Sequence, residues 1–215
     1  NRDCGLSSKL DGQVVDMGAV MGAALSGQPV PEVPYTLSDM AADAIGLLDH
    51  LGIDRAHIMG ASMGGMIVQT MAIEHPTRVR SLISVMSMTG EPEYGQPAPE
   101  AAEALLAPPP ESREEYIESA PRWMIWQSKK YQDLEKVRQN AAAGYDRSFY
   151  PEGGPRQLAA IYASGSRAEA LQQLDVPTLV IHGRDDTLIT PSGGFRTAEL
   201  VPGAHLLFVG DMGHD

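Results

Sequence analysis

Residues 57–74, HIMGASMGGMIVQTMAIE, are the stretch that decides the fold. A short apolar run at 57–60 leads into the pentapeptide GASMG at 60–64, and residues 66–74 continue with the spacing of a helix. A serine flanked by small residues on a sharp strand-to-helix turn projects its side chain above the edge of a sheet. The stretch therefore predicts a buried strand, a tight turn that presents Ser62, and a helix.

Helical and strand patterns alternate on both sides of this stretch. Residues 37–51 repeat apolar side chains at helical spacing, with Ser38 as the predicted N-cap and Gly52 as the predicted end. Short apolar runs predict further buried strands at residues 82–86, 178–181 and 206–209. This order is typical of an α/β fold with a mostly parallel sheet, and we expect flanking helices on both faces of that sheet.

The segment between the second and third predicted strands has a different pattern. Prolines interrupt its first part, and helical stretches follow near residues 111–130, 131–144 and 154–164, with no strand pattern. We therefore predict that a helical lid is inserted into the α/β core. We predict three parts. Residues 1–88 form a core part with the turn that presents Ser62, residues 89–167 form the lid, and residues 168–215 form a second core part.

The composition excludes several classes of partner. The 215 residues contain 16 Lys and Arg against 28 Asp and Glu, which gives a formal net charge of −12. Nucleic acids and anionic membranes bind basic surfaces, so neither is an expected partner. Cys4 is the single cysteine and cannot form an internal disulfide or a thiolate metal site. We expect a cytoplasmic protein that acts on a small molecule, and its oligomeric state stays open.

Ser62 needs two further groups before it can act as a nucleophile. A base must take the hydroxyl proton, and an acid must orient that base. In this architecture the acid follows the serine in the chain and the histidine follows the acid. Asp185 and Asp186, after the third predicted strand, are both candidates for the acid. His205 precedes the last strand, whereas His214 follows it at the edge expected for Ser62, so we predict His214 as the base.

Three motifs carry a resemblance to a known family. GASMGG at 60–65, HGRDDTLITP at 182–191 and GDMGH at 210–214 follow one another as they do in the α/β-hydrolase superfamily, which the chain resembles. The opening NRDCGLSS resembles a loop after an early strand of that fold, and residues 47–83 resemble its segment around the nucleophile turn. Within the superfamily, the chain most resembles bacterial serine hydrolases such as polyketide methylesterases and cofactor-free haloperoxidase-like esterases.

The resemblance implies roles for individual residues. The acid of the family stands third after the glycine that ends the strand, which is Gly183 here, and this selects Asp186. The backbone N–H of Met63 would be one donor of an oxyanion hole. The second donor comes in the family from a His-Gly loop, and no such loop precedes Ser62. We therefore expect the sequence to be truncated at both ends, without the N-terminal strands and the C-terminal helix of the family.

The expected activity is hydrolysis of a carboxylic ester of a small, largely apolar substrate through an acyl-enzyme. This chemistry requires no metal and no organic cofactor. Trp123 and Trp126 of the predicted lid are candidates for the substrate pocket, with packing of the lid onto the body as the alternative. Perhydrolysis (as in haloperoxidase-like enzymes), lactone opening and C–C bond hydrolysis would use the same three residues, and a non-catalytic binding module is a further alternative.

Overall fold

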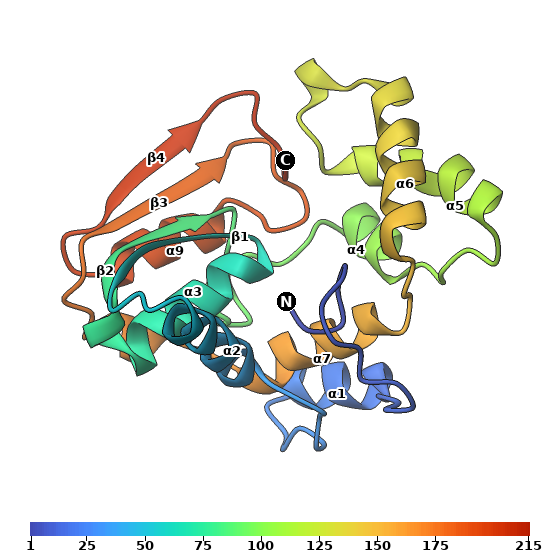
Figure 1. The fold of residues 1–215 in the computed structure, drawn as a ribbon. Coiled ribbons are helices and arrows are strands. Elements are labelled where there is room, and N and C mark those ends of the chain that lie inside the picture. The colour runs from blue at the N-terminus through green and yellow to red at the C-terminus, as the bar shows by residue number, and fades with distance from the viewer.

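A four-stranded parallel sheet forms the centre of the computed structural model, which describes all 215 residues (Figure 1). Its strands are β1 (Ala56–Ala61), β2 (Val79–Val85), β3 (Thr178–Gly183) and β4 (His205–Val209), and they lie side by side in that order. All four predicted strands are present, with their ends shifted by a few residues. The predicted α/β fold with a parallel sheet is confirmed.

Helices make up most of the remaining regular structure. The α-helices are α1 (Met17–Leu25), α2 (Leu37–His50), α3 (Met63–Glu74), α4 (Pro99–Leu106), α5 (Arg113–Ser119), α6 (Leu134–Ser148), α7 (Gly153–Ser164), α8 (Ala168–Leu171) and α9 (Ser192–Leu200). Short 3₁₀ helices are η1 (Pro76–Arg78), η2 (Ala120–Ile125) and η3 (Lys129–Tyr131). None of these helices has both the length and the apolar character needed to cross a bilayer.

The start of α2 differs from the sequence prediction. Thr36, and not Ser38, is the N-cap, and it forms a reciprocal capping box with Asp39. The Thr36 N–H donates to Asp39 Oδ2 at 2.8 Å, while the Ser38 hydroxyl donates to Glu74 of α3 at 2.5 Å. The capping box satisfies free N–H groups at the start of the helix that Ser38, already inside the first turn, cannot reach.

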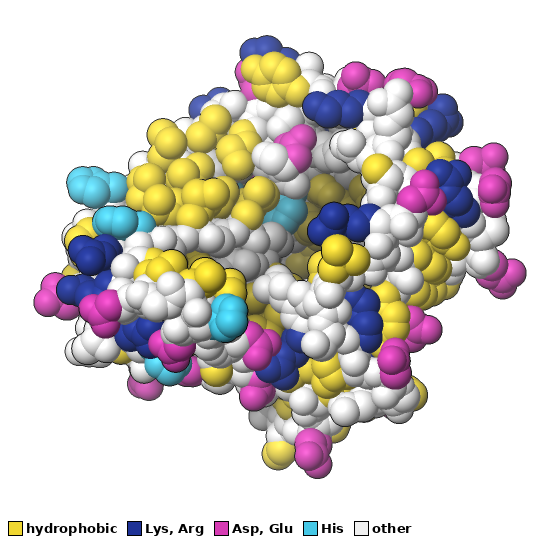
Figure 2. Space-filling view, in the orientation of Figure 1, with side chains coloured by type: hydrophobic (Ala, Val, Ile, Leu, Met, Phe, Trp, Pro, Cys, Tyr) yellow, Lys and Arg dark blue, Asp and Glu magenta, His cyan; other side chains and the backbone are white.

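Helices cover one face of the sheet, and the other face is open. α3 packs on β1 and β2, α9 packs on β3 and β4, and α8 contacts both helices (Figure 1). The covered face holds the core, which includes Ile58, Met66, Met71 and Leu82. On the open face Met59 is 68% exposed and Leu207 is 51% exposed, and Figure 2 shows apolar side chains gathered over β3 and β4. The expectation of helices on both faces is therefore wrong, because right-handed crossovers that all run in one direction across a sheet place their helices on one side.

Between β2 and β3 the chain contains helices and no strand, as the sequence predicts. α5, α6 and η2 pack against one another and form the part of the molecule farthest from the sheet (Figure 1). Their aromatic rings form a cluster in which Tyr116 contacts Trp123, Tyr145 and Phe149 at centroid distances of 5.3, 5.5 and 5.5 Å. This cluster gives residues 96–149, which we call the helical segment, a small apolar core of their own.

A tight turn joins β1 to α3. Ser62 occupies it with φ of 56° and ψ of −124°, a region that L-residues rarely adopt. The Ser62 N–H donates to the Val85 carbonyl at 2.9 Å, which fastens the turn to the end of β2. A Cβ atom on Gly60 would overlap the Gly64 carbonyl, so the helix can turn back over the strand only because residue 60 is glycine.

A buried ion pair fastens the N-terminal loop to α7. Arg156 Nε lies 2.8 Å from Asp3 Oδ2, and the two side chains are 4% and 0% exposed. Asp3 also accepts the Leu10 N–H at 2.8 Å and the Tyr35 hydroxyl at 2.9 Å. Burial alone would raise the pKa of the Asp3 carboxyl, but the hydrogen bonds from Arg156, Leu10 and Tyr35 outweigh it and hold that pKa below its ordinary value.

We expect Gly60→Ala to destabilise the protein by about 3 kcal/mol or more, because the new methyl group would force the start of α3 away from β1. Gly64→Ala is the matched control: it lies in the first turn of the same helix and a Cβ there meets no atom within 4 Å. The control should be neutral or slightly stabilising, since alanine favours a helix over glycine. Urea unfolding measures both variants, and equal stabilities would contradict this account of the turn.

We expect the Asp3–Arg156 pair to make the protein sensitive to acid. The pKa of Asp3 is lower in the folded protein than in the unfolded chain, so the pair stabilises the fold above the ordinary carboxyl pKa. That contribution is lost as the pH falls through the lowered pKa, in a window below about pH 4. Asp3→Asn should remove this part of the pH dependence and lower the free energy of unfolding at neutral pH by about 3 kcal/mol, because Arg156 stays buried without its anion.

Urea unfolding across that pH range measures the effect of Asp3→Asn. Asp43→Asn is the matched control, because it breaks the exposed ion pair between Arg2 and Asp43, in which the Asp43 side chain is 49% exposed. It should lower the free energy of unfolding by less than about 1 kcal/mol. An Asp3→Asn protein whose stability falls in acid as steeply as that of the unchanged protein would show that this pair does not control the acid response.

Candidate active site

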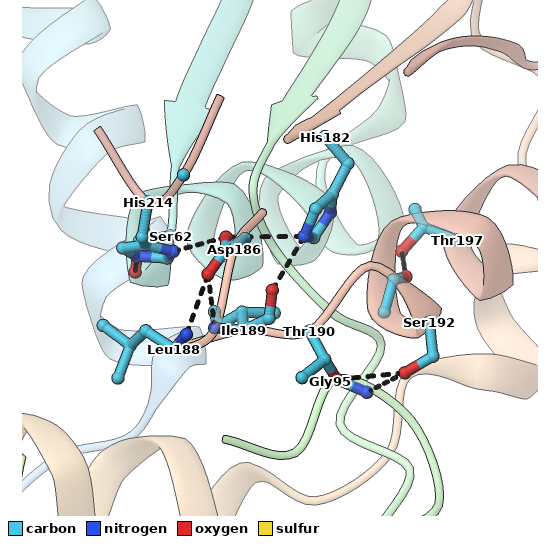
Figure 3. Close-up of polar contacts among 12 residues, drawn as sticks. Ser62, Gly95, His182, Asp186, Leu188, Ile189, Thr190, Ser192, Thr197 and His214 are labelled. Carbon is cyan, nitrogen blue, oxygen red and sulfur yellow. Dashed lines mark hydrogen bonds and ion pairs between the residues drawn. The ribbon is translucent and has the colours of Figure 1, made fainter. Parts of the chain in front are cut away.

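Three loops at one edge of the sheet carry the candidate catalytic side chains (Figure 3). Ser62 follows β1, Asp186 follows β3 and His214 follows β4. The carboxyl ends of parallel strands lie at the same edge, so these loops meet although Ser62 and His214 are 152 positions apart in the chain. The helical segment faces this edge, and Figure 2 shows that the surface is hollowed between the two.

The three side chains form one hydrogen-bonded chain. His214 Nε2 lies 2.9 Å from Ser62 Oγ, and His214 Nδ1 lies 2.7 Å from Asp186 Oδ2. An ionised Asp186 accepts the proton on Nδ1, which leaves Nε2 as the acceptor for the Ser62 hydroxyl. The arrangement has the geometry that a nucleophile, a base and an orienting acid require.

The surroundings of Asp186 keep its carboxyl ionised. Its side chain is fully buried, and its Oδ1 accepts the N–H groups of Leu188 and Ile189, each at 2.9 Å (Figure 3). Burial alone would raise the pKa of Asp186, but hydrogen bonds from His182, His214 and the Ile189 N–H outweigh it. They hold that pKa below its ordinary value. At neutral pH Asp186 is therefore an anion that can stabilise a protonated His214.

The two alternatives considered from the sequence lie away from this chain of hydrogen bonds. The Asp185 side chain makes no hydrogen bond, and its backbone N–H donates to the Met212 carbonyl at 2.9 Å. His205 is the first residue of β4 and is exposed at the opposite end of that strand. The structure thus brings together Ser62, Asp186 and His214, the set that was predicted.

The Met63 N–H, the predicted oxyanion donor, lies at the start of α3 directly after Ser62, and its role stays a prediction. Met63 is the first residue of α3, where backbone N–H groups have no partner within the helix. No other group of the chain accepts this N–H, so it is free to bind an external oxygen next to Ser62. The positive end of the helix dipole adds to the attraction for negative charge at this point. No second oxyanion donor was assigned from the sequence.

The two tryptophans of the helical segment differ in their contacts. Trp123 packs edge-on against Tyr116 and lies under the Arg122 guanidinium, which corresponds to the packing alternative. Trp126 is half-buried, and its carbonyl accepts the His214 N–H at 2.6 Å. The segment around Trp126 therefore adjoins the site, whereas Trp123 belongs to the aromatic cluster of the helical segment. Their assignment to a substrate pocket stays a prediction.

His182 is a neighbour of the site to which the sequence assigned no role. Its side chain is 1% exposed, and its Nε2 lies 2.8 Å from the Ile189 carbonyl and 3.5 Å from Asp186 Oδ2 (Figure 3). A Cβ on Gly194 would overlap the His182 ring, so α9 presses directly on it. In the sequence, only its position in a predicted buried strand, four residues before the acid, could have indicated a role for His182, and local packing explains that position equally well. Nowhere do three or more His, Cys, Asp or Glu side chains gather as a metal ion would require.

Comparison with known proteins agrees with this geometry. A family profile described as the alpha/beta hydrolase fold matches residues 5–215. The chain is 28% identical over 201 residues to a 2-hydroxymuconate semialdehyde hydrolase of Pseudomonas putida, which covers 91% of this chain and 68% of that protein. It is 26% identical over 204 residues to rhodomycin D methylesterase DnrP of Streptomyces peucetius, with coverage of 84% and 68%.

A solved structure leads to the same family. The meta-cleavage product hydrolase of Pseudomonas fluorescens IP01 is similar with a TM-score of 0.67 and 26% identity over 86% of this chain and 67% of that one. The chain thus spans about two thirds of the length of these relatives. The family profile covers nearly all of the chain, and the relatives are named as hydrolases and an esterase. The chain therefore belongs to the α/β-hydrolase family of enzymes.

Proposed function

We propose that the protein is a serine hydrolase that cleaves a carboxylic ester of a small, largely apolar substrate through an acyl-enzyme. The observation that carries the proposal is the continuous chain of hydrogen bonds from Ser62 through His214 to Asp186. In this proposal Ser62 is the nucleophile, His214 is the general base and acid, and Asp186 orients His214. The free N–H of Met63 stabilises the oxyanion.

The proposed reaction has two halves that use the same groups. Ser62 Oγ attacks the ester carbonyl carbon while its proton moves to His214 Nε2, and the carbonyl oxygen becomes an oxyanion facing the Met63 N–H. The intermediate collapses, and the leaving alcohol takes the proton from Nε2. Water then attacks the acyl-enzyme and gives its proton to Nε2, and the departing Ser62 Oγ recovers that proton. The net change is ester plus water to acid plus alcohol.

A second candidate is hydrolysis of a carbon–carbon bond beside a carbonyl group. The name of the Pseudomonas putida relative, a 2-hydroxymuconate semialdehyde hydrolase, favours it, whereas the Streptomyces peucetius relative is a methylesterase. Both reactions add a nucleophile to a carbonyl group and differ in what leaves, an alkoxide or a carbanion. A carbanion leaves only where the substrate itself can delocalise the charge, so the substrate decides between the two reactions.

A substrate panel tests the proposal. We expect p-nitrophenyl acetate and butyrate to be hydrolysed with a higher kcat/KM than 2-hydroxymuconate semialdehyde, and Ser62→Ala to lower the rate by at least about 10³-fold. The reverse order of kcat/KM would establish the carbon–carbon reaction instead. Labelling of Ser62 by a fluorophosphonate without turnover of either class would mean that the substrate class is wrong. A folded protein without label and without turnover would contradict the serine mechanism.

The two adjacent aspartates provide a second test. Asp186→Asn should lower kcat by about 10³- to 10⁴-fold, because an amide can hold the wrong tautomer of His214 and does not stabilise its charged form. Asp185→Asn is the matched control, since the same change one residue earlier removes a carboxylate that makes no hydrogen bond. It should keep kcat within about twofold. Ester turnover and the rate of fluorophosphonate labelling measure both variants, and a larger loss in Asp185→Asn would reverse the assignment of the acid.

A further inference from the structure

A short part of the helical segment crosses the loop that carries His214. Residues 125–128 run from the end of η2 to the start of η3, and we call them the strap. The strap is not part of the hydrogen-bonded chain of the site, and its serine, Ser128, was not singled out in the sequence. Ser128 is nevertheless buried, with 6% of its surface exposed.

The strap holds three consecutive residues, of which His214 is the middle one. The His214 N–H donates to the Trp126 carbonyl at 2.6 Å. The preceding Gly213 N–H donates to Ser128 Oγ at 3.0 Å. The carboxylate of the following Asp215 accepts both the Ser128 N–H, at 2.9 Å, and the Ser128 hydroxyl. Ser128 therefore connects the residues on either side of the candidate base.

The strap also packs tightly and reaches the loop of the acid. A Cβ on Gly213 would overlap the Trp126 carbonyl and lie 2.6 Å from the Ser128 nitrogen, so no gap separates the two segments. The Thr187 hydroxyl, next to Asp186 in the chain, donates to the Ile125 carbonyl at 3.2 Å. One four-residue segment thus contacts both loops that supply the partners of Ser62.

The loop of His214 depends on such contacts because it has no regular structure. It follows β4 as a turn in which Asp211 has φ of 57°. On the side of β3 it is held by the hydrogen bond between the Met212 carbonyl and the Asp185 N–H. Holding each residue of a loop in one conformation costs backbone entropy, which hydrogen bonds to a fixed segment offset. Reactive groups must also be held to within about 0.5 Å for full activity.

We infer that Ser128 is a positioning residue for His214. Its hydroxyl accepts the Gly213 N–H and donates to Asp215, so it fixes the backbone on both sides of the base without touching the reacting atoms. The inference rests on the proposed function, in which His214 is the base. It adds that the helical segment, through the strap, sets the distance between His214 and Ser62.

Kinetics of three variants test the inference. Ser128→Ala removes the acceptor for Gly213 and a donor to Asp215, and we expect kcat to fall at least about tenfold with KM within about twofold. Ser128→Thr keeps the hydroxyl and should retain most of the kcat of the unchanged protein. Ser119→Ala is the matched control in the same helical segment, because its hydroxyl bonds only to the Tyr116 carbonyl at 3.2 Å. It should leave kcat and KM unchanged.

A spectroscopic signature makes the test independent of turnover. The proton between His214 Nδ1 and Asp186 Oδ2 should give a low-field ¹H resonance that disappears in His214→Ala. In Ser128→Ala we expect this resonance to be broadened by exchange with water, and in Ser119→Ala to be unchanged. If the unchanged protein has the resonance but shows no turnover and no fluorophosphonate label, the proposed function fails while the positioning role is still measured.

Two results would overturn the inference. One is a folded Ser128→Ala protein with unchanged kcat and an unchanged resonance, and the other is a rise in KM alone, which would place Ser128 against the substrate. If Ser128→Ala does not fold, Asp215→Ala replaces it, because Asp215 is exposed and its loss removes one of the two anchors. A decrease in kcat of about threefold or more at an unchanged melting temperature is then expected, and an unchanged kcat would refute the positioning role.

Discussion

Parallel pairing of β1, β2, β3 and β4 is the constraint on which the candidate site depends. The register aligns Ala61 with Val85, Val85 with Ile181 and Gly183 with Val209, so the strands end at nearly the same level. Every loop after a strand consequently opens at one edge. A shift of one pairing would move an entire loop by about 3.3 Å, which exceeds the tolerance of a hydrogen bond between Ser62 and His214.

Close backbone crossings refine what the sheet sets only coarsely. At each of the three loops a glycine lies where a side chain would overlap a carbonyl group of another segment. Gly60 faces the Gly64 carbonyl, Gly183 faces the Met212 carbonyl, and Gly213 faces the Trp126 carbonyl. Because these glycines have no side chain, each loop can approach the main chain of another segment to van der Waals contact. The contacts are with main-chain atoms, which adapt less than side chains do. Such contacts have little freedom to relax, and this keeps the side chains that the loops carry at fixed separations.

The sequence predicts those parts of the structure that depend on local pattern and chain order. The pentapeptide at 60–64, between a strand pattern and a helix pattern, indicates Ser62, and the place of His214 after the last strand indicates the base. The choice of Asp186 needs the family resemblance. Two adjacent carboxylates look alike until the N–H groups that only one of them accepts are known. The proposed role of Ser128 depends on a hydrogen bond between residues 85 positions apart, and no periodicity in the sequence predicts such a contact. The missing cover on one sheet face likewise depends on the direction of the crossovers, which an alternating pattern of helices and strands does not contain.

The helical segment is fastened to the core at more than one point, and this limits how far it can move as one body. Near its beginning, the Ala98 N–H donates to the Thr187 carbonyl at 2.9 Å and the Thr190 hydroxyl donates to the Gln96 carbonyl at 2.9 Å. In its middle, the strap is hydrogen-bonded to the loop that carries His214. α5 and α6 share the aromatic cluster and lie beyond these attachments (Figure 1). A swing of the whole segment would break the contacts that hold His214. α5 and α6 are in turn connected to this attachment, because Tyr116 packs against Trp123 of η2, which leads directly into the strap.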